Sequence, residues 1–247
     1  MNAICVIPAR LESTRLPRKL LRQIAGKPLI QHVYDNAKKA KKPSRVIVAC
    51  DHSELEKAVK VFGGDVIMTS AKHQSGTERL TEVAEKLKAD LFVNLQADEP
   101  LMHPSVIDDL VTAMEMNADY KMTTACIRMD SEEDFKSPNV VKVVRNHKDE
   151  ALYFSRAPIP YDRDKIDCSF FKHLGIYAYT RDFLLKLETL KASHLEKREK
   201  LEQLRVLDNG FSIKVLETAY DSIGVDVEED LRKVEKILLG KQKVPDA

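Results

Sequence analysis

The chain has 247 residues, of which 43% are hydrophobic and 32% charged, a composition typical of a globular protein and not of a disordered one. Its 40 Lys and Arg residues are balanced by 39 Asp and Glu residues, so no overall basic field favours nucleic acid or a membrane as a partner. The cysteines are far apart and lack the spacing of a zinc site or a disulfide framework: Cys5, Cys50, Cys126 and Cys168. The apolar run at the N-terminus is too short for a signal sequence or a membrane span. We therefore expect a cytoplasmic protein with reduced thiols.

The first half of the chain alternates short apolar runs with stretches of helical period. The expected strands, all continuously apolar and therefore buried on both faces, are residues 3–7, 45–49, 65–68 and 91–95. The helices expected between them start at Pro28, Ser53, Ser75 and Pro104. Ser53 with Glu56 and Ser75 with Glu78 have the spacing of a capping box, and Gly63 is placed to end the second helix. This alternation predicts an α/β fold with a mostly parallel, doubly wound sheet and right-handed crossovers.

The second half loses this alternation. Strands with few helices between them are expected at residues 121–128, 140–145, 151–155 and 172–179. A charged helix is expected from about His194 to Gly210, then a strand over 212–216 and a closing amphipathic helix over 228–239. These elements predict a small mixed-sheet extension of the parallel sheet.

The loop after the first expected strand is strongly basic. A single acid, Glu12, stands there against five cations: Arg10, Arg15, Arg18, Lys19 and Arg22. Ligands of open parallel sheets bind beyond the carboxyl ends of the strands, and guanidinium and ammonium groups match phosphate oxygens. The loop therefore predicts a triphosphate cradle built from side chains, with a solvated charged loop as the competing interpretation. No G-x-G-x-x-G follows this strand and no G-x-x-x-x-G-K-[ST] occurs, so the backbone phosphate-binding motifs of dinucleotide-dependent oxidoreductases and P-loop kinases are missing.

Ten short motifs occur in a fixed order along the chain. The first three are Ile-Pro-Ala-Arg at 7–10, Ser-Thr-Arg-Leu-Pro at 13–17 and Gly-Lys-Pro-Leu-Ile at 26–30. The others lie at 49–52, 73–79, 94–100, 153–156, 173–177, 201–205 and 224–226. Together they resemble the family of 3-deoxy-manno-octulosonate cytidylyltransferases, also called CMP-KDO synthetases. The His-Gln-Ser-Gly-Thr-Glu-Arg motif at 73–79 is the most specific, because other sugar nucleotidyltransferases share mainly the basic loop and the acidic strand end.

The resemblance implies a fold, a reaction and an assembly. The fold is of the nucleotide-diphospho-sugar transferase type, in one domain over 1–247. Within it, a nucleotide-binding half over 1–120 precedes a sugar-binding and dimerisation lobe over 121–220 and a closing segment over 221–247. The reaction joins CTP and KDO into CMP-KDO and pyrophosphate, which supplies an activated sugar for lipopolysaccharide assembly. The family is homodimeric, so a homodimer is expected.

The resemblance also implies residue roles. The catalytic positions are Arg10, Arg15, Lys19 and Asp98. The nucleotide-binding positions are Pro8, Ala9, Arg10, Arg15, Lys19, Ser75, Gly76 and Gln96. The sugar-binding positions are Arg156, His173, Tyr177, Glu202 and Gln203. Magnesium is assigned to Asp98 and Asp226, because Mg²⁺ prefers one or two carboxylates together with water and substrate phosphates; one or two ions are both compatible with this set. More ordinary roles compete: Ser75 as a helix cap, Asp98 as a turn residue and His173 as a structural hydrogen-bonding group.

Three positions depart from the family pattern. Arg18 and Ala97 stand where the family usually has Gly, and a left-handed backbone there would cost roughly 1–2 kcal/mol. We expect Arg18 to face solvent. Tyr161 replaces a common Trp.

Three other functions compete with the KDO reaction. One is the same reaction on 8-amino-3,8-dideoxy-manno-octulosonate. Another is activation of a sialic acid, whose enzymes match the chain in the first loop alone. The third is a nucleotide-binding regulator without catalysis, against which the intact Lys19, Asp98 and Asp226 argue.

Overall fold

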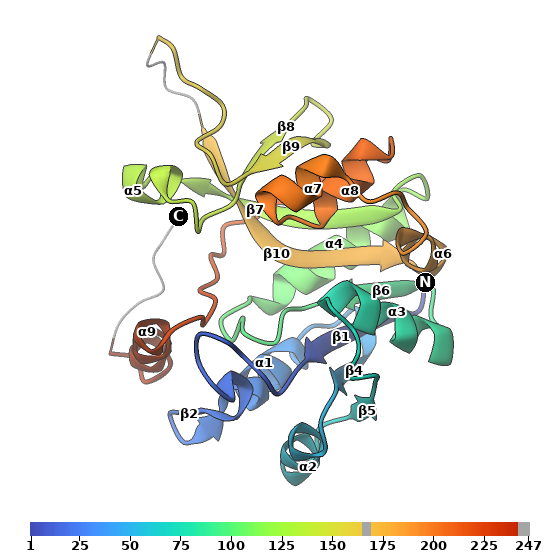
Figure 1. Ribbon diagram of the computed structural model, residues 1–247, viewed down its shortest axis with the longest axis vertical. Helices are drawn as coiled ribbons and strands as arrows, with labels where there is room; N and C mark the ends of the chain where they lie inside the picture. Colours follow the sequence, from blue (N-terminus) through green and yellow to red (C-terminus); the bar gives the residue numbers. More distant parts are fainter. Residues whose placement is uncertain (165–168, 242–247) are drawn as a thin grey trace.

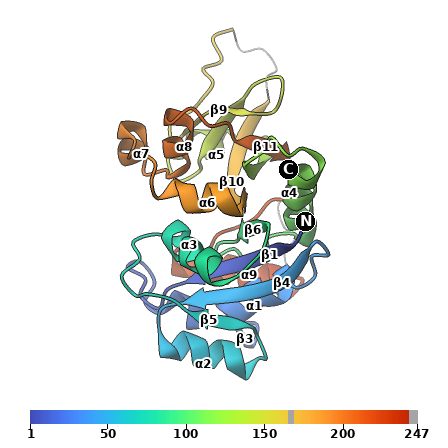
Figure 2. The same cartoon turned by 90° about the vertical axis from the view of Figure 1, so that its right-hand side faces the viewer.

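A nine-stranded sheet runs through the molecule (Figures 1 and 2), for which the computed structural model describes residues 1–164 and 169–241. Cys168 lies outside the described residues. The first half of the chain supplies β1 (Ala3–Ala9), β4 (Pro43–Cys50), β5 (Val66–Met68) and β6 (Leu91–Asn94). β1 pairs in parallel with β4 and β6, and β4 pairs in parallel with β5. These strands confirm the predicted parallel half of the sheet.

The second half extends the same sheet with mixed directions. Its strands are β7 (Met122–Met129), β8 (Lys142–Arg145), β9 (Ala151–Ser155), β10 (Phe170–Thr180) and β11 (Lys214–Glu217). β10 runs antiparallel to both β6 and β7, whereas β7 and β11 are parallel. The main order is β11-β7-β10-β6-β1-β4-β5, with β8 and β9 as an antiparallel ribbon attached to β10. The predicted mixed extension is therefore confirmed.

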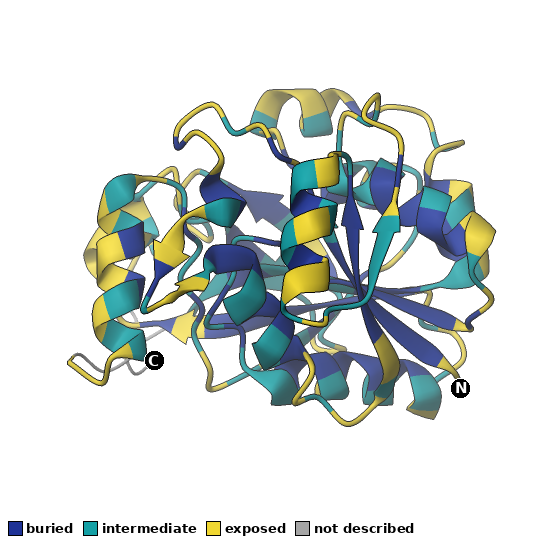
Figure 3. Ribbon diagram, turned by 90° about the horizontal axis from the view of Figure 1, so that it is seen from below, coloured by how far each residue is buried: buried dark blue, intermediate teal, exposed yellow. Residues whose placement is uncertain are grey.

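Helices cover both faces of the sheet, because the strands direct apolar side chains to each face. In β1, Cys5 and Ile7 join one core cluster and Ile4 and Val6 the other. The first cluster packs against α1 (Leu29–Ala37), α2 (Ser53–Val61), α4 (Pro104–Met116) and α9 (Glu228–Leu238). The second packs against α3 (Gly76–Lys86), α6 (Arg181–Leu187) and α8 (Gln203–Asp208). Figure 3 shows the result as buried strands between helices whose outer sides are exposed.

Several short elements complete the described chain. They are η1 (Lys19–Leu21), β2 (Gln23–Ile24), β3 (Lys27–Pro28), α5 (Glu132–Lys136) and α7 (His194–Glu199). None of the helices in the ranges 1–164 and 169–241 is long and apolar enough to cross a membrane. Among the described cysteines, Cys5, Cys50 and Cys126 are free and buried.

Two of the predicted helix starts are wrong in detail. α2 is capped by His52, whose Nδ1 accepts from the Glu54 N–H at 3.2 Å, so Ser53 is the first helical residue and forms no capping box with Glu56. An imidazole acceptor in extended backbone takes the place that a hydroxyl was expected to fill. Pro28 precedes α1 as its cap and is not its first residue. The cap at Ser75 is confirmed, because its Oγ accepts from the Glu78 N–H at 3.2 Å.

The charged helix predicted between His194 and Gly210 is also wrong, because two helices, α7 and α8, occupy this segment. Lys200 has a left-handed backbone with φ of 56°, which ends α7. The bend lets the Arg205 guanidinium bind the Glu196 carboxylate through two bonds of 2.7 and 2.8 Å. In a continuous helix residues nine apart would be roughly 13 Å apart along the axis, so this ion pair depends on the break.

Candidate active site

Two neighbouring cavities lie beside the sheet, and the smaller one opens at the carboxyl edge of the parallel strands. The smaller, about 320 Å³, is lined by the basic loop after β1, the start of α3 and the residues after β6. The larger, about 580 Å³, is lined by α3, β10, α8 and the end of α6. His73, Gln74 and Ser75 line both, so the two cavities share a wall. The Thr77 hydroxyl donates to the Glu202 carboxylate at 2.7 Å and links α3 to α8 beside this wall.

The smaller cavity brings together most of the predicted nucleotide-binding residues. Those that line it are Pro8, Arg10, Arg15, Lys19, Ser75, Gly76 and Gln96. Ala9 is fully buried and does not line the cavity with its side chain. Gly76 lets α3 approach the end of β1, because a Cβ there would lie 3.2 Å from Cγ of Pro8. The loop and the helix start therefore form two closely spaced walls, one cationic and one offering backbone N–H groups to an anion.

Opposite charges converge at the floor of this cavity. The Lys19 ammonium lies 2.6 Å from Oδ2 of Asp98 and 3.3 Å from Oδ1 of Asp226. The Arg15 guanidinium lies 2.9 Å from Oδ2 of Asp226. The two aspartates thus meet as predicted at one edge of the sheet, although they come from opposite ends of the chain.

Asp226 is held in place by backbone contacts on both sides. The preceding Val225 N–H donates to the Asp98 carbonyl at 2.9 Å. The Asp226 N–H donates to the Asp230 carboxylate in α9, also at 2.9 Å. The segment before α9 is therefore anchored directly to the loop that carries Asp98.

This pair of carboxylates fits a magnesium ion. Mg²⁺ needs few protein ligands, because it keeps several waters and binds substrate phosphates. Over the part of the chain that the structure describes, no cluster of three or more His, Cys, Asp and Glu residues is placed to hold a metal. A site of two carboxylates, completed by water and phosphate oxygens, matches magnesium better than a closed protein cage would.

Glu99 is a half-buried acid beside this pair that sequence reasoning missed. Burial, together with the negative charge of Asp98, raises the pKa of Glu99 to about 7, although the Ser222 hydroxyl donates to its carboxylate. A Cβ at Gly224 would lie 3.2 Å from Oε1 of Glu99, so Gly224 makes room for the carboxylate. Glu99 thereby joins the Asp98 loop to the segment that carries Asp226. The available signal was that this acid directly follows a predicted magnesium ligand, Asp98, in the loop after β6.

The larger cavity receives three of the five predicted sugar-binding residues, Tyr177, Glu202 and Gln203. His173 and Arg156 line neither cavity. The His173 imidazole is buried against the Phe154 ring and bonded to the Thr124 hydroxyl at 2.9 Å, and burial lowers its pKa to about 3. The Arg156 guanidinium donates to the carbonyls of Glu199 and Pro138, so it is held within the lobe around β9. Sugar binding by these two residues stays a prediction.

The departures from the family pattern have different outcomes. Arg18 has a left-handed backbone with φ of 55°, and its side chain is exposed and paired with Glu54 outside the smaller cavity. Ala97 lines the cavity without a left-handed backbone, so no strain arises there. Tyr161 is exposed. Of these departures, Arg18 alone has the strained left-handed backbone, and its side chain lies outside the smaller cavity.

The fold and the charged edge define a nucleotidyltransferase. A synthase of 4-diphosphocytidyl-2C-methyl-D-erythritol from Anaerococcus prevotii has the same fold, with a TM-score of 0.65, 13% identity and coverage of 96% of this chain and 98% of that one. Residues 4–217 match the family model described as cytidylyltransferase. The chain belongs to the cytidylyltransferase family.

Relatives with higher identity narrow the comparison. The 3-deoxy-manno-octulosonate cytidylyltransferase of Geobacter metallireducens is 50% identical, over 95% of this chain and 96% of its own length. The 3-deoxy-manno-octulosonate cytidylyltransferase of Thermodesulfovibrio yellowstonii is 46% identical, over 96% of this chain and 98% of its own length. A solved structure of CMP:2-keto-3-deoxy-manno-octonic acid synthetase complexed with CTP superposes with a TM-score of 0.94 at 43% identity and covers 98% of this chain and 100% of that one.

Proposed function

We propose that this protein transfers CMP from CTP to KDO and releases pyrophosphate, as a step in lipopolysaccharide biosynthesis. The observation that carries the proposal is the meeting of Lys19 with Asp98 and Asp226 on the floor of a cavity walled by the basic loop. Cations that neutralise phosphate charge and carboxylates that fit magnesium are what nucleotidyl transfer needs. The names of the relatives and the CTP complex of the similar structure support the same reaction.

The smaller cavity is the CTP site in this proposal. Arg10, Arg15 and Lys19 hold the triphosphate, and the backbone of residues 8–9 with Gln96, Ser75 and Gly76 holds the cytidine. In the reaction the anomeric hydroxyl of the sugar attacks the α-phosphorus, its proton leaves, and the bond from that phosphorus to the pyrophosphate oxygen breaks. Magnesium, when bound by Asp98 and Asp226, supplies charge neutralisation at the phosphates. Lys19 orients both carboxylates through its bonds to them.

The larger cavity is the sugar site. Tyr177, Glu202 and Gln203 offer it one phenol, one carboxylate and one amide, a set suited to several sugar hydroxyls. His173 supports this wall, because its ring lies 5.4 Å from that of Tyr177. Arg156 is proposed to bind the sugar carboxylate, which requires its guanidinium to exchange a backbone carbonyl for the substrate. The shared wall at residues 73–75 brings the two substrates together.

Three further parts of the proposal concern organisation. Residues 1–120 form the nucleotide half, 121–220 the sugar-binding and dimerisation lobe, and 221–247 the closing segment of the chain. The protein is proposed to be a homodimer and to act in the cytoplasm.

Pyrophosphate release, measured with each nucleotide and sugar acid in turn, tests this function. CTP with KDO and magnesium should give the highest kcat/KM. A higher value with 8-amino-3,8-dideoxy-manno-octulosonate or a sialic acid would assign the sugar differently, and no release with any sugar acid would refute the transferase.

Arg156→Ala tests the carboxylate role. It should raise the KM for KDO by about 10- to 150-fold, because a charge-assisted bond is worth roughly 1.5–3 kcal/mol, and leave the KM for CTP nearly unchanged. Arg181→Ala is the control, since Arg181 also donates to a backbone carbonyl, that of Ala84 at 3.0 Å, and lines neither cavity. Equal effects on both KM values would contradict the assignment.

A further inference from the structure

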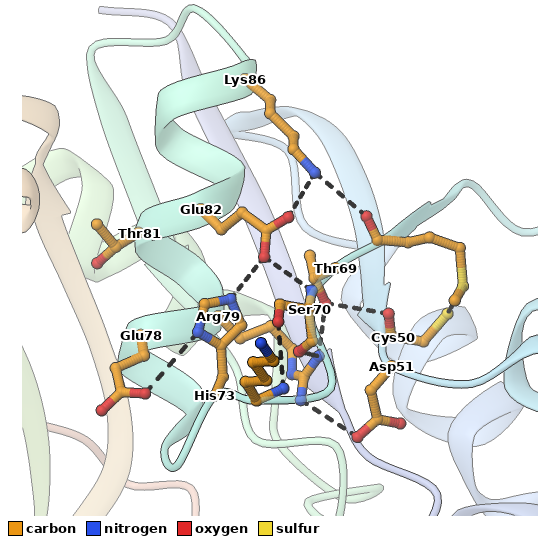
Figure 4. Close-up of polar contacts among 12 residues, drawn as sticks. Cys50, Asp51, Thr69, Ser70, His73, Glu78, Arg79, Thr81, Glu82 and Lys86 are labelled. Atoms are coloured by element: carbon orange, nitrogen blue, oxygen red, sulfur yellow. Dashed lines mark hydrogen bonds and ion pairs between the residues drawn. The ribbon is translucent and has the colours of Figure 1, made fainter.

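An ion pair between Asp51 and Arg79 lies at the smaller cavity, which Arg79 helps to line from the α3 side, and it has no role in the account so far. Asp51 directly follows β4, and Arg79 is the fourth residue of α3. The side chains are 14% and 4% exposed, so both charges are largely withdrawn from water. Figure 4 shows them within a group of polar contacts between α3 and the strand ends. Burying a charge is costly unless it is paired, so the Asp51–Arg79 pair holds α3 against the end of β4.

Arg79 connects α3 to the ends of two strands. One guanidinium nitrogen, Nη2, lies 3.2 Å from Oδ2 of Asp51, after β4. The other, Nη1, donates to the Thr69 hydroxyl at 2.5 Å and to the Ser70 carbonyl at 3.2 Å, both just after β5. Thr69 in turn donates to the Cys50 carbonyl at 3.0 Å. The planar guanidinium therefore sets where the first turn of α3 lies relative to the sheet edge.

Asp51 connects the same group to the basic loop. Its second oxygen, Oδ1, accepts the Leu11 N–H at 3.0 Å. Leu11 is buried and directly follows Arg10, which lines the cavity. Two bonds in series, from Arg79 to Asp51 and from Asp51 to Leu11, thus run from the α3 wall of the cavity to the loop wall.

A separate set of contacts fixes the loop between β5 and α3. Oε2 of Glu82 accepts the Ser70 N–H at 2.8 Å and lies 2.5 Å from Nε2 of His73 (Figure 4). Burial acts to raise the pKa of Glu82, but Lys86, the Ser70 N–H and His73 outweigh it and lower the pKa to about 2. The α3 side of the cavity is therefore already rigid, and Asp51 is what ties the basic loop to it.

The spacing of the two walls is tight. Gly76 packs so closely on Pro8 that an added Cβ would come within 3.2 Å of its ring. A small shift of the loop relative to α3 would thus change both the fit of a nucleotide and the direction of Arg10. Because Asp51 already neutralises Arg79, this arginine acts on the position of the loop more than on the phosphates.

We infer that Asp51 and Arg79 are positioning residues that set the separation of the two walls of the nucleotide cavity and thereby the affinity for CTP. The inference deepens the proposed function, since it rests on that cavity as the CTP site. It concerns the nucleotide and not the sugar, because Asp51 contacts the basic loop, Arg79 lines the smaller cavity from α3, and neither residue lines the larger cavity.

The test is Asp51→Asn in the full-length protein, with CTP affinity measured by calorimetry in the absence of sugar. Asparagine retains an acceptor for the Leu11 N–H but leaves the Arg79 charge unpaired. We expect the Kd for CTP and the KM for CTP to rise by about tenfold, and the KM for the sugar acid to stay within about twofold. Arg79→Lys, which keeps the charge but loses the fork, should give a smaller shift in the same direction. If Asp51→Asn does not fold, Arg79→Lys tests the same inference.

A double variant and a matched control complete the design. Arg79→Gln is measured alone and together with Asp51→Asn, which removes both charges, and the Kd of the double variant for CTP should be lower than the product of these two single effects predicts. Asp65→Asn is the control, because the Arg45–Asp65 pair joins β4 to the start of β5 at the opposite end of the same strands, at 2.7 Å. It should leave CTP affinity unchanged.

Three results would overturn the inference: unchanged CTP affinity in Asp51→Asn and Arg79→Lys, equal rises in the KM for both substrates, or the same loss in Asp65→Asn. Failure of the proposed function is separate, because it appears as wild-type protein that releases no pyrophosphate. The Kd for CTP tests the Asp51–Arg79 pair by binding alone, so it does not depend on turnover.

Discussion

Replacing Asp98 by Asn separates the proposed metal role from a structural one. The Asp98 side chain is 31% exposed and bonded to Lys19 at 2.6 Å, so its loss should lower the free energy of unfolding by no more than about 1 kcal/mol, as for other partly exposed pairs. Turnover should suffer far more. Removing a mere partner of a metal ligand costs about 10- to 100-fold, so removing the ligand should lower kcat/KM by at least about 100-fold, or about 2.7 kcal/mol.

Pyrophosphate release against magnesium concentration, together with a denaturant titration, measures both quantities. Asp35→Asn is the matched control, because Asp35 pairs with Lys27 at 2.7 Å with a 39% exposed side chain and lines neither cavity. It should retain wild-type turnover and lose similar stability. If Asp98→Asn kept more than a tenth of the wild-type kcat/KM in magnesium, Asp98 would not be a metal ligand in this protein.

Three further substitutions test other parts of the structure. Gly76→Ala places a Cβ 3.2 Å from Cγ of Pro8. In steady-state kinetics the KM for CTP should therefore rise severalfold, while the KM for the sugar acid stays constant. An unchanged KM for CTP would contradict the tight spacing of the two cavity walls. His173 has its pKa lowered by burial from 6.5 to about 3, so the unfolded chain takes up a proton that the folded protein does not, and stability is lost as the pH falls below about 6.5. His173→Gln should remove about 1.2 kcal/mol of this loss between pH 7 and pH 5.5 in denaturant titrations, and the same change in unfolding free energy for both proteins would refute a neutral, buried His173. Lys142 is fully buried and donates to three backbone carbonyls at 2.6–2.8 Å. Lys142→Met should therefore lower the free energy of unfolding by roughly 3 kcal/mol. A loss below about 1 kcal/mol would show that water replaces the amine as the donor to these carbonyls.

The parallel half of the sheet was predictable because strands buried on both faces are continuous apolar runs in the sequence. The strands β1, β4, β5 and β6 are short apolar runs, and the structure shows each within one or two residues of its predicted bounds. The basic loop followed from the same pattern, since it comes straight after the first such run. The meeting of Asp98 and Asp226 came from the family resemblance and from the rule that ligands bind at the carboxyl ends of parallel strands.

The features that sequence reasoning missed depend on local geometry without a periodic pattern or on contacts between distant segments. His52 replaces Ser53 as a cap because of a local geometry that many residues can adopt. The break at Lys200 is fixed by an ion pair across it, and α5 and α6 are too short to show a clear period. Glu99 looks like an ordinary surface acid until Ser222, far along the chain, is placed against it. Periodicity carries no information about such pairs.

The anchoring of Val225 to the carbonyl of Asp98 has a consequence for the order in which the protein becomes active. While the chain is being synthesised, the cradle of Arg10, Lys19 and Asp98 emerges from the ribosome long before Asp226 does. A chain that stops before Asp226 has only one of the two carboxylates proposed for magnesium and should not consume CTP. Activity should therefore begin once the stretch ahead of α9 has been made and has bound to the sheet edge.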